Sequence, residues 1–228
     1  MSLRACLAAA GLAAVLLLGG CAAGGQDGPE IGCATAATPC LSGDATVALT
    51  TSKGEVRLDL DGAAAPLTAG NFLDLVRRGA YNGTAFHRVV RQPTPFVVQG
   101  GDPLSANPVT PANQYGSGNF IDPDTGQARL IPLELKLSGE ESPRYGEVIT
   151  SPTANRQLVL AHQRGAVAMA RSADPNSASA QFYVALQALP ELDGRYAVFG
   201  RVSSGMDVVD RIQQGDRIIR ATVVEGGD

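Results

Sequence analysis

The run FHRVV, residues 86–90, and the run FVVQGGD, residues 96–102, decide the fold of this chain. Both are rich in Phe and Val, a composition that is typical of β-strands. Side chains in a strand alternate between its two faces, so Arg88 is expected to share a face with Phe86 and Val90. An arginine beside apolar groups is costly unless it is paired or used. Arg88 therefore needs either a carboxylate partner or a function.

The rest of the chain repeats the pattern of short strands with few helices. Residues 45–61 read as a hairpin that turns at 52–54. A helix is expected to start with Thr68 as its N-cap and to stop at Gly79, and a second helix at 205–215. Further strands are expected at residues 164–171, 180–187, 196–202 and 217–225. Strands dominate without regular βαβ alternation, which favours a mainly β fold and a closed antiparallel β-barrel.

Bulk composition excludes several classes of protein. A length of 228 residues suits one good-sized core, and the net charge of −4 gives no basic surface for a nucleic-acid partner. The dinucleotide-binding, calcium-loop and nucleophile-elbow motifs are all broken or missing. We therefore expect neither a metal nor a cofactor, and we expect a monomer.

The N-terminus reads as a targeting segment. Arg4 precedes a short apolar run that ends in small residues, which is typical of a signal peptide over residues 1–20. An uncleaved membrane anchor is the alternative. Residues 18–21, LGGC, resemble the bacterial lipobox, which implies cleavage before Cys21 and lipidation of that cysteine. Removing residues 1–20 takes away one arginine and changes the net charge to −5.

Residues 21–43 are expected to form a flexible tether between lipid and domain, because they are rich in Gly, Ala, Thr and Pro. Cys33 and Cys40 lie within it, with six residues between them. Outside the cytoplasm such a pair favours a small disulfide loop. A zinc site would need more ligands than this pair and the chain's 2 histidines readily supply. Two free thiols are the third possibility.

Four segments in order, at compatible spacing, resemble the cyclophilin family of peptidyl-prolyl isomerases. They are FHRVV, FVVQGGD, GAVAMAR with SAQFYV, and LDGRYAVFGRV, and the resemblance covers residues 44–226. It implies a closed eight-stranded β-barrel capped by two α-helices, over a domain of residues 44–228. It also implies isomerisation of X-Pro bonds in proline-containing polypeptides, with Arg88 and Gln99 as catalytic residues. The implied substrate-binding residues are Phe86, Phe96, Val97, Ala170, Gln181, Tyr183, Leu192 and Tyr196.

Several positions depart from the family pattern. Arg171 stands where Asn is common, Tyr183 where Phe is usual, Tyr196 where many relatives have His, and Glu191 where many have Trp. Because that Trp supports ciclosporin binding in the family, we expect weak sensitivity to the drug. A long insertion at about residues 103–160 has two interpretations. It could line the rim of the groove and adjust substrate choice, and surface elaboration is the simpler alternative.

Two other functions compete with an isomerase of exported proteins in the bacterial cell envelope. One is a proline-peptide binding or scaffolding module with little turnover, which Arg171, Tyr183 and the insertion favour. The other is a lipoprotein that captures a small solute, although a single short domain argues against it. Arg88 together with Gln99 separates the isomerase from both, since a pure binder has no use for a donor aimed at the proline nitrogen. Each pocket residue alone also fits ordinary core packing.

Overall fold

The computed structural model describes residues 32–33 and 36–227. Within them the chain forms ten strands, three α-helices and three short 3-10 helices. The strands are β1 (Asp44–Thr51), β2 (Gly54–Asp61), β3 (Arg88–Val89), β4 (Val97–Gly100), β5 (Glu134–Leu135), β6 (Arg144–Tyr145), β7 (Ala166–Met169), β8 (Phe182–Ala185), β9 (Val198–Ser204) and β10 (Ile218–Gly226). The α-helices are α1 (Pro66–Arg77), α2 (Pro152–Asn155) and α3 (Met206–Arg211). The 3-10 helices are η1 (Pro103–Ala106), η2 (Ala112–Gln114) and η3 (Pro190–Leu192).

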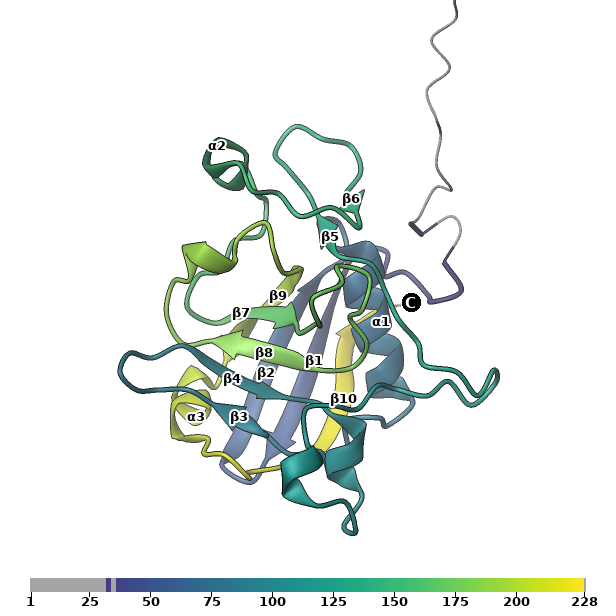
Figure 1. The fold of residues 1–228 in the computed structure, drawn as a ribbon, viewed down its shortest axis with the longest axis vertical. Helices are drawn as coiled ribbons and strands as arrows, with labels where there is room; N and C mark the ends of the chain where they lie inside the picture. Colours follow the sequence, from purple (N-terminus) through teal and green to yellow (C-terminus); the bar gives the residue numbers. More distant parts are fainter. Residues whose placement is uncertain (1–31, 34–35, 228) are drawn as a thin grey trace, which may run out of the picture.

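Eight strands form one curled antiparallel sheet in the order β10-β1-β2-β9-β7-β8-β4-β3. Figure 1 shows β3, β4, β7 and β8 crossing steeply over the direction of β1, β2 and β10. The sheet is open, so the prediction of a closed barrel was wrong. Its two ends approach each other through an isolated bridge between Ala85 and Arg217. Gly83 and Gly215 on either side adopt positive φ angles of 79° and 95°, which interrupt the extended backbone that a continuous ladder needs.

The inner face of the curled sheet holds the main core. Phe72 of α1 lies at its centre, with ring centroids 4.8 Å from Tyr81, 5.3 Å from Phe182 and 5.0 Å from Phe199. The helices α1 and α3 lie apart in Figure 1, and both pack into this core, α1 through Phe72 and α3 through Val208 and Val209. Alternate residues of β1 and β2 point into the same core, as the period of a strand requires, and β9 adds Phe199.

The helices differ from the prediction in their starts, lengths and number. α1 begins at Pro66 rather than after Thr68, because proline suits the first helical position and Thr68 is already buried inside the first turn. α3 ends at Arg211, several residues before the predicted limit. α2 lies in the insertion, where no helix was predicted, so the described residues contain three α-helices rather than two.

The insertion has its own small core and holds α1 in place. Strands β5 and β6 pair beside a cluster formed by Leu133, Leu135, Leu137, Ile149 and Ala197. The carboxylate of Glu134, which is 1% exposed, accepts hydrogen bonds from the backbone N–H groups of Leu67 and Thr68 at 3.1 and 2.7 Å. Burial raises the pKa of Glu134, and these donors offset part of that rise. The insertion therefore supplies the N-terminal cap that α1 lacks locally.

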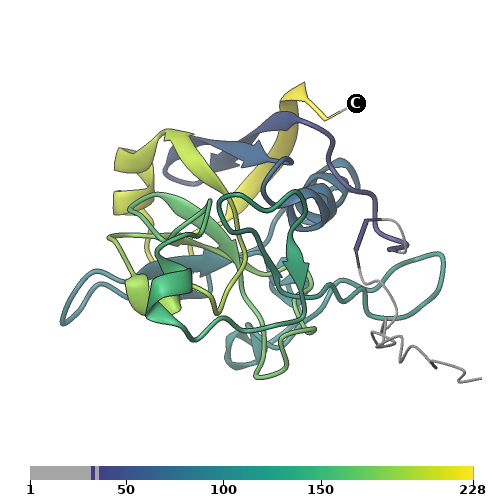
Figure 2. The same cartoon turned by 90° about the horizontal axis from the view of Figure 1, so that it is seen from above.

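The described end of the predicted tether packs against the domain. Leu41 is 4% exposed and donates its backbone N–H to the carbonyl of Pro66 at 2.9 Å. Cys33 and Cys40 form a disulfide. Figure 2 shows this N-terminal segment beside the loop of the insertion that contains Gln127, and the two line a common hollow.

The predicted signal peptide and Cys21 lie outside the described residues. Among the described residues, none of the helices combines the length and apolar character needed to span a bilayer.

Candidate functional site

The outer face of β4, β7 and β8 carries a second apolar cluster, on the opposite side of the sheet from the main core. Val98, Val167 and Phe182 point inward, whereas their neighbours Val97 and Ala168 point outward. This alternation gives one stretch of sheet two apolar faces. The outer cluster consists of buried Val97, Ala166, Ala168, Tyr183, Ala185, Leu189 and Val198, with Phe96, Leu160, Ala170, Leu192 and Tyr196 partly buried against it.

The outer cluster brings together six of the eight predicted substrate-binding residues. Tyr183 and Tyr196 meet edge to face, with ring centroids 5.9 Å apart and planes at 82°. Leu192 reaches the cluster from η3, and Ala170 follows β7. The remaining members are Phe96 and Val97. The partly exposed members of this set offer an apolar surface to a ligand.

Arg88 lies beside this cluster and is held by a row of amide side chains. Arg88 and Gln99 are directly paired in the antiparallel register of β3 and β4. The Arg88 Nη1 donates to Gln99 Oε1 at 3.4 Å, and Gln99 Nε2 donates to Gln181 Oε1 at 3.2 Å. The Arg88 guanidinium carbon lies 5.8 Å from the centroid of the Phe96 ring. The side chain is exposed, so its remaining donors face solvent.

Phe86 does not join the outer cluster. It is 2% exposed and packs in the main core. The alternation argument placed it on the face of Arg88, but β3 contains only Arg88 and Val89, and Phe86 precedes it. There the backbone bonds to the chain near Asp216 instead of continuing the strand. Phe86 therefore lies in the main core, apart from the predicted substrate-binding residues that the outer cluster brings together.

The insertion forms one wall of a groove next to the outer cluster. This polar groove has a volume of about 330 Å³. It is lined by Gln99, Gly116, Ser117, Asn119, Leu130, Ala170, Arg171, Ser172, Ser177, Ser179 and Gln181. Gln181 Nε2 donates to the carbonyls of Gly116 and Gly118 at 3.0 and 2.9 Å, which fixes the insertion to the sheet. Part of the insertion thus belongs to the site and is more than surface elaboration.

The sequence did not predict a hydrogen-bond network that lies behind Tyr183 of the outer cluster. His162, which is 1% exposed, contacts the Tyr183 hydroxyl through Nε2 at 2.8 Å. Its Nδ1 and its backbone N–H both lie 2.8 Å from Asp193 Oδ1. The presence of a tyrosine at a buried strand position was the available signal, because a buried hydroxyl needs a partner.

The charge states in this network follow from burial. Burial lowers the pKa of His162 below its ordinary value of 6.5, and the hydrogen bond to Asp193 offsets part of that shift. Burial also raises the pKa of Tyr183, so its hydroxyl stays protonated. With Nδ1–H donating to Asp193, Nε2 of the neutral ring accepts a hydrogen bond from the Tyr183 hydroxyl. The network fixes the orientation of the Tyr183 ring in the outer cluster.

Arg171 lies between the outer cluster and the polar groove and contacts both. Its guanidinium carbon lies 4.8 Å from the centroid of the Tyr196 ring. Nε and Nη2 donate to the carbonyl of Arg195 at 2.9 and 2.6 Å. Nη1 donates to the carbonyls of Ser172 and Ala173 at 2.8 and 3.2 Å. The side chain is therefore fixed, although nothing in this set neutralises its charge.

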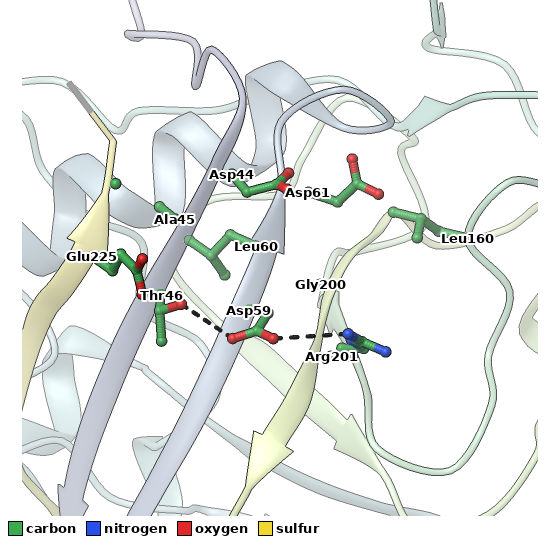
Figure 3. A pocket seen from close by; sticks show the side chains of 11 residues that line it. Asp44, Ala45, Thr46, Asp59, Leu60, Asp61, Leu160, Gly200, Arg201 and Glu225 are labelled. Atoms are coloured by element: carbon green, nitrogen blue, oxygen red, sulfur yellow. Dashed lines mark hydrogen bonds and ion pairs between the residues drawn. The ribbon is translucent and has the colours of Figure 1, made fainter.

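A larger hollow of about 620 Å³ lies elsewhere, between the ends of β1, β2 and β9. Figure 3 shows its labelled carboxylates Asp44, Asp59, Asp61 and Glu225, with Arg201 at the edge. We call it the acidic hollow. Among the described residues no group of three or more His, Cys, Asp or Glu is arranged to hold a metal ion. None of the predicted site residues lines it.

Comparison with known proteins identifies a family over most of the chain. Residues 46–227 match the family described as "Cyclophilin type peptidyl-prolyl cis-trans isomerase/CLD". A "Probable peptidyl-prolyl cis-trans isomerase" of Brucella suis is 36% identical over 191 residues, which cover 78% of this chain and 82% of that protein.

Two further relatives are much longer than this chain. A "Putative thylakoid lumen peptidyl-prolyl cis-trans isomerase" of Synechocystis is 39% identical over 83% of this chain and 49% of its own length. The chloroplastic peptidyl-prolyl cis-trans isomerase CYP38 of Arabidopsis thaliana is 39% identical over 75% of this chain and 38% of its own length. The chain thus spans half or less of these two relatives.

Solved structures share the fold. The cyclophilin AquaCyp293 of Hirschia baltica superposes with a TM-score of 0.55 at 25% identity, over 81% of this chain and 76% of that one. A cyclophilin-type isomerase of Cryptosporidium parvum, crystallised in the presence of the dipeptide Ala-Pro, superposes with a TM-score of 0.57 at 22% identity. That match covers 79% of this chain and 99% of the other.

Proposed function

This chain belongs to the cyclophilin-type peptidyl-prolyl cis-trans isomerase family, and from that premise we propose that it accelerates rotation about X-Pro bonds in exported polypeptides. The observation that carries the proposal is the position of Arg88. Its guanidinium is held by Gln99 beside the partly exposed apolar side chains of Phe96, Leu192 and Tyr196. A proline ring packed there brings its nitrogen toward the guanidinium.

The chemistry required of Arg88 follows from the energy barrier to rotation about the X-Pro peptide bond. A peptide bond resists rotation by about 18–20 kcal/mol because of its partial double-bond character. At the top of the barrier conjugation is lost, and the proline nitrogen becomes pyramidal with a usable lone pair. A guanidinium N–H of Arg88 donates to that lone pair. The planar ground state has no such acceptor, so the hydrogen bond favours the transition state selectively.

Arginine is well suited to donate to the proline nitrogen while Gln99 holds it in position. Arginine remains charged, and its planar fork can hold one partner while another N–H points to the substrate. A hydrogen bond to a charged group contributes about 1.5–3 kcal/mol, and about 1.4 kcal/mol corresponds to tenfold in rate. Arg88 therefore accounts for roughly 10- to 100-fold. The remaining rate acceleration comes from the outer cluster, which holds the proline ring in place while the bond rotates.

We further propose an extracytoplasmic, lipid-anchored location. The signal peptide of residues 1–20, the LGGC run and the lipidated Cys21 form one consistent pattern. The names of the Synechocystis and Arabidopsis relatives place those proteins in the thylakoid lumen and the chloroplast, which fits export from the cytoplasm. In this proposal residues 21–43 link the lipid to a monomeric domain of residues 44–228.

The test is NMR exchange spectroscopy on an Ala-Pro peptide with the full chain, its Arg88→Ala variant and an Arg201→Ala control. Arg201 is an exposed arginine at the acidic hollow, so its removal matches the charge change without touching the site. We expect fast exchange with the parent and the control, and a loss of about tenfold or more with Arg88→Ala. No acceleration by the parent, with peptide binding retained, would instead establish a proline-peptide scaffold.

A further inference from the structure

The site carries unpaired positive charge. Within the described part of the chain neither Arg88 nor Arg171 is ion-paired, whereas Arg129 bridges Asp74 and Asp122 at 2.5 and 2.6 Å. Arg88 contacts an amide and an aromatic ring, and Arg171 contacts backbone carbonyls and an aromatic ring. Both cations therefore remain available to a charged ligand.

The polar groove adds no negative charge to balance them. Its lining consists of hydroxyl, amide, glycine and apolar residues, and Arg171 is its only ionisable side chain among the described residues. Four carboxylates lie near the groove but outside its lining. Asp102, which is buried, accepts the backbone N–H groups of Gly116 and Gly118 beneath the groove wall. Asp193 Oδ1 accepts from His162, Asp174 Oδ1 accepts from the backbone of its own turn, and Glu191 lies in solvent on η3.

Arg171 is a fixed charge rather than a mobile one. Its hydrogen bonds to the carbonyls of Ser172, Ala173 and Arg195 hold the guanidinium against the Tyr196 ring. A ligand that pairs with it does not have to order a long side chain, which is the usual cost of a surface ion pair. Its place between the outer cluster and the groove puts this charge close to the residues that flank a bound proline.

Positive charge at the site contrasts with the rest of the molecule. The chain has a net charge of −4, and the acidic hollow gathers four of its carboxylates. A cationic groove on an acidic protein attracts acidic segments and discourages basic ones.

We infer, resting on the proposed function, that the site selects polypeptide segments carrying Asp or Glu within a few residues of the X-Pro bond. Arg171 is the specificity-determining residue. The acidic side chain lies in the polar groove beside Arg171 while the proline ring packs on the outer cluster. The hydroxyl groups of Ser117 and Ser177 offer further donors to the carboxylate.

The test uses pairs of synthetic peptides around one Ala-Pro bond. The two peptides of a pair differ at one position only, where one carries Glu and the other Gln. Different pairs place this position before or after the proline. Both kcat/KM, by NMR exchange, and Kd, by NMR titration, are measured with the full chain, with Arg171→Gln, with Arg171→Lys and with an Arg201→Gln control. At the best position we expect Glu to be preferred about three- to fivefold, the size of an exposed ion pair.

The variants separate charge from structure. Arg171→Gln should bring the Glu-to-Gln ratio close to one, whereas Arg171→Lys and Arg201→Gln should keep most of it. A preference by Kd without any acceleration would retain this inference and remove the isomerase proposal. Equal kcat/KM and Kd for Glu and Gln at every position would overturn the inference while leaving the isomerase intact. Equal losses on both peptides in Arg171→Gln would overturn it too, because Arg171 would then only support the loop.

Discussion

The outer cluster with its polar groove and the acidic hollow are two concave regions that the same sheet builds in different ways. The acidic hollow is the larger, at about 620 Å³ against about 330 Å³ for the polar groove. Its Asp59 accepts from Thr46 at 3.2 Å and lies 3.9 Å from the exposed Arg201, so its contacts are those of an ordinary surface. Volume alone therefore does not locate the site.

The smaller region differs in what lies behind its surface. Gln99 and Gln181 connect Arg88 to the insertion through 3.2 and 3.0 Å hydrogen bonds. Tyr183 connects the outer cluster to buried His162. The hydrogen bond between Tyr183 and His162 is buried, and a buried polar network is costly unless it is complete, whereas the row from Arg88 to Gly116 is part-buried or exposed. Both hold side chains in fixed positions beside an open surface. Pre-organised side chains, rather than empty space, distinguish a site from a hollow.

The strongest test of this contrast removes one hydroxyl from each region. Tyr183→Phe leaves the Nε2 of buried His162 without a partner, so the free energy of unfolding should fall by about 1–3 kcal/mol. Thr46→Val removes a half-buried hydrogen bond to Asp59 in the acidic hollow and should cost less than about 0.5 kcal/mol. Urea denaturation measures both. Equal losses would mean that the two regions are built alike.

A second comparison keeps the charge and changes its shape. Arg88→Lys loses the planar fork that Gln99 holds, so kcat/KM for an Ala-Pro peptide should fall about tenfold, equivalent to about 1.4 kcal/mol. Arg201→Lys at the acidic hollow should leave kcat/KM unchanged. Full activity in Arg88→Lys would contradict the role given to the fork, because a point charge would then suffice.

The smallest effect concerns pH. Burial keeps His162 neutral in the folded chain, so the unfolded chain binds more protons once the pH falls below the ordinary value of 6.5. The stability that His162 contributes is therefore complete above that pH and is lost as the pH falls through the lower folded-state pKa. No corresponding effect is expected from Thr46→Val at the acidic hollow.

Comparison of the wild type with His162→Asn isolates this effect. His87 and Glu134 also have shifted pKa values, but they titrate in both chains and cancel in the difference. Urea denaturation between about pH 7.5 and 5 should show the wild type losing its advantage as the pH falls. A constant difference would show that folding leaves the pKa of His162 unshifted, and one that grows toward low pH would show that the folded chain favours the charged form; either contradicts the prediction.

The site residues were predicted from the resemblance to the cyclophilin family, whereas local periodicity predicted only which side chains share a face. Val97 and Gln99 share a face because β4 is a regular paired strand. The argument failed for Phe86, since β3 is too short for alternation to extend that far. The prediction of a closed barrel failed for a related reason. Gly83 and Gly215 turn the chain where the hydrogen-bond ladder between the two edge strands would have to continue.

Contacts between distant segments could not be predicted from local pattern. His162 and Asp193 are 31 positions apart, and Glu134 lies 67 positions from Leu67 at the start of α1. Neither pair belongs to a repeated spacing, so only the folded chain brings them together. For the same reason the sequence could not decide whether the insertion lines the groove, and it gave no sign that Glu134 caps α1.

X-Pro segments are proposed to bind at Arg88 and the outer cluster rather than in the acidic hollow. The direct measurement is a titration of the ¹⁵N-labelled chain with an Ala-Pro peptide, followed through backbone amide shifts. We predict shifts at Arg88, Gln99 and Ala170, with Asp59 and Arg201 unmoved. Shifts centred on Asp59 and Arg201, with Arg88 and Gln99 unmoved, would contradict the account.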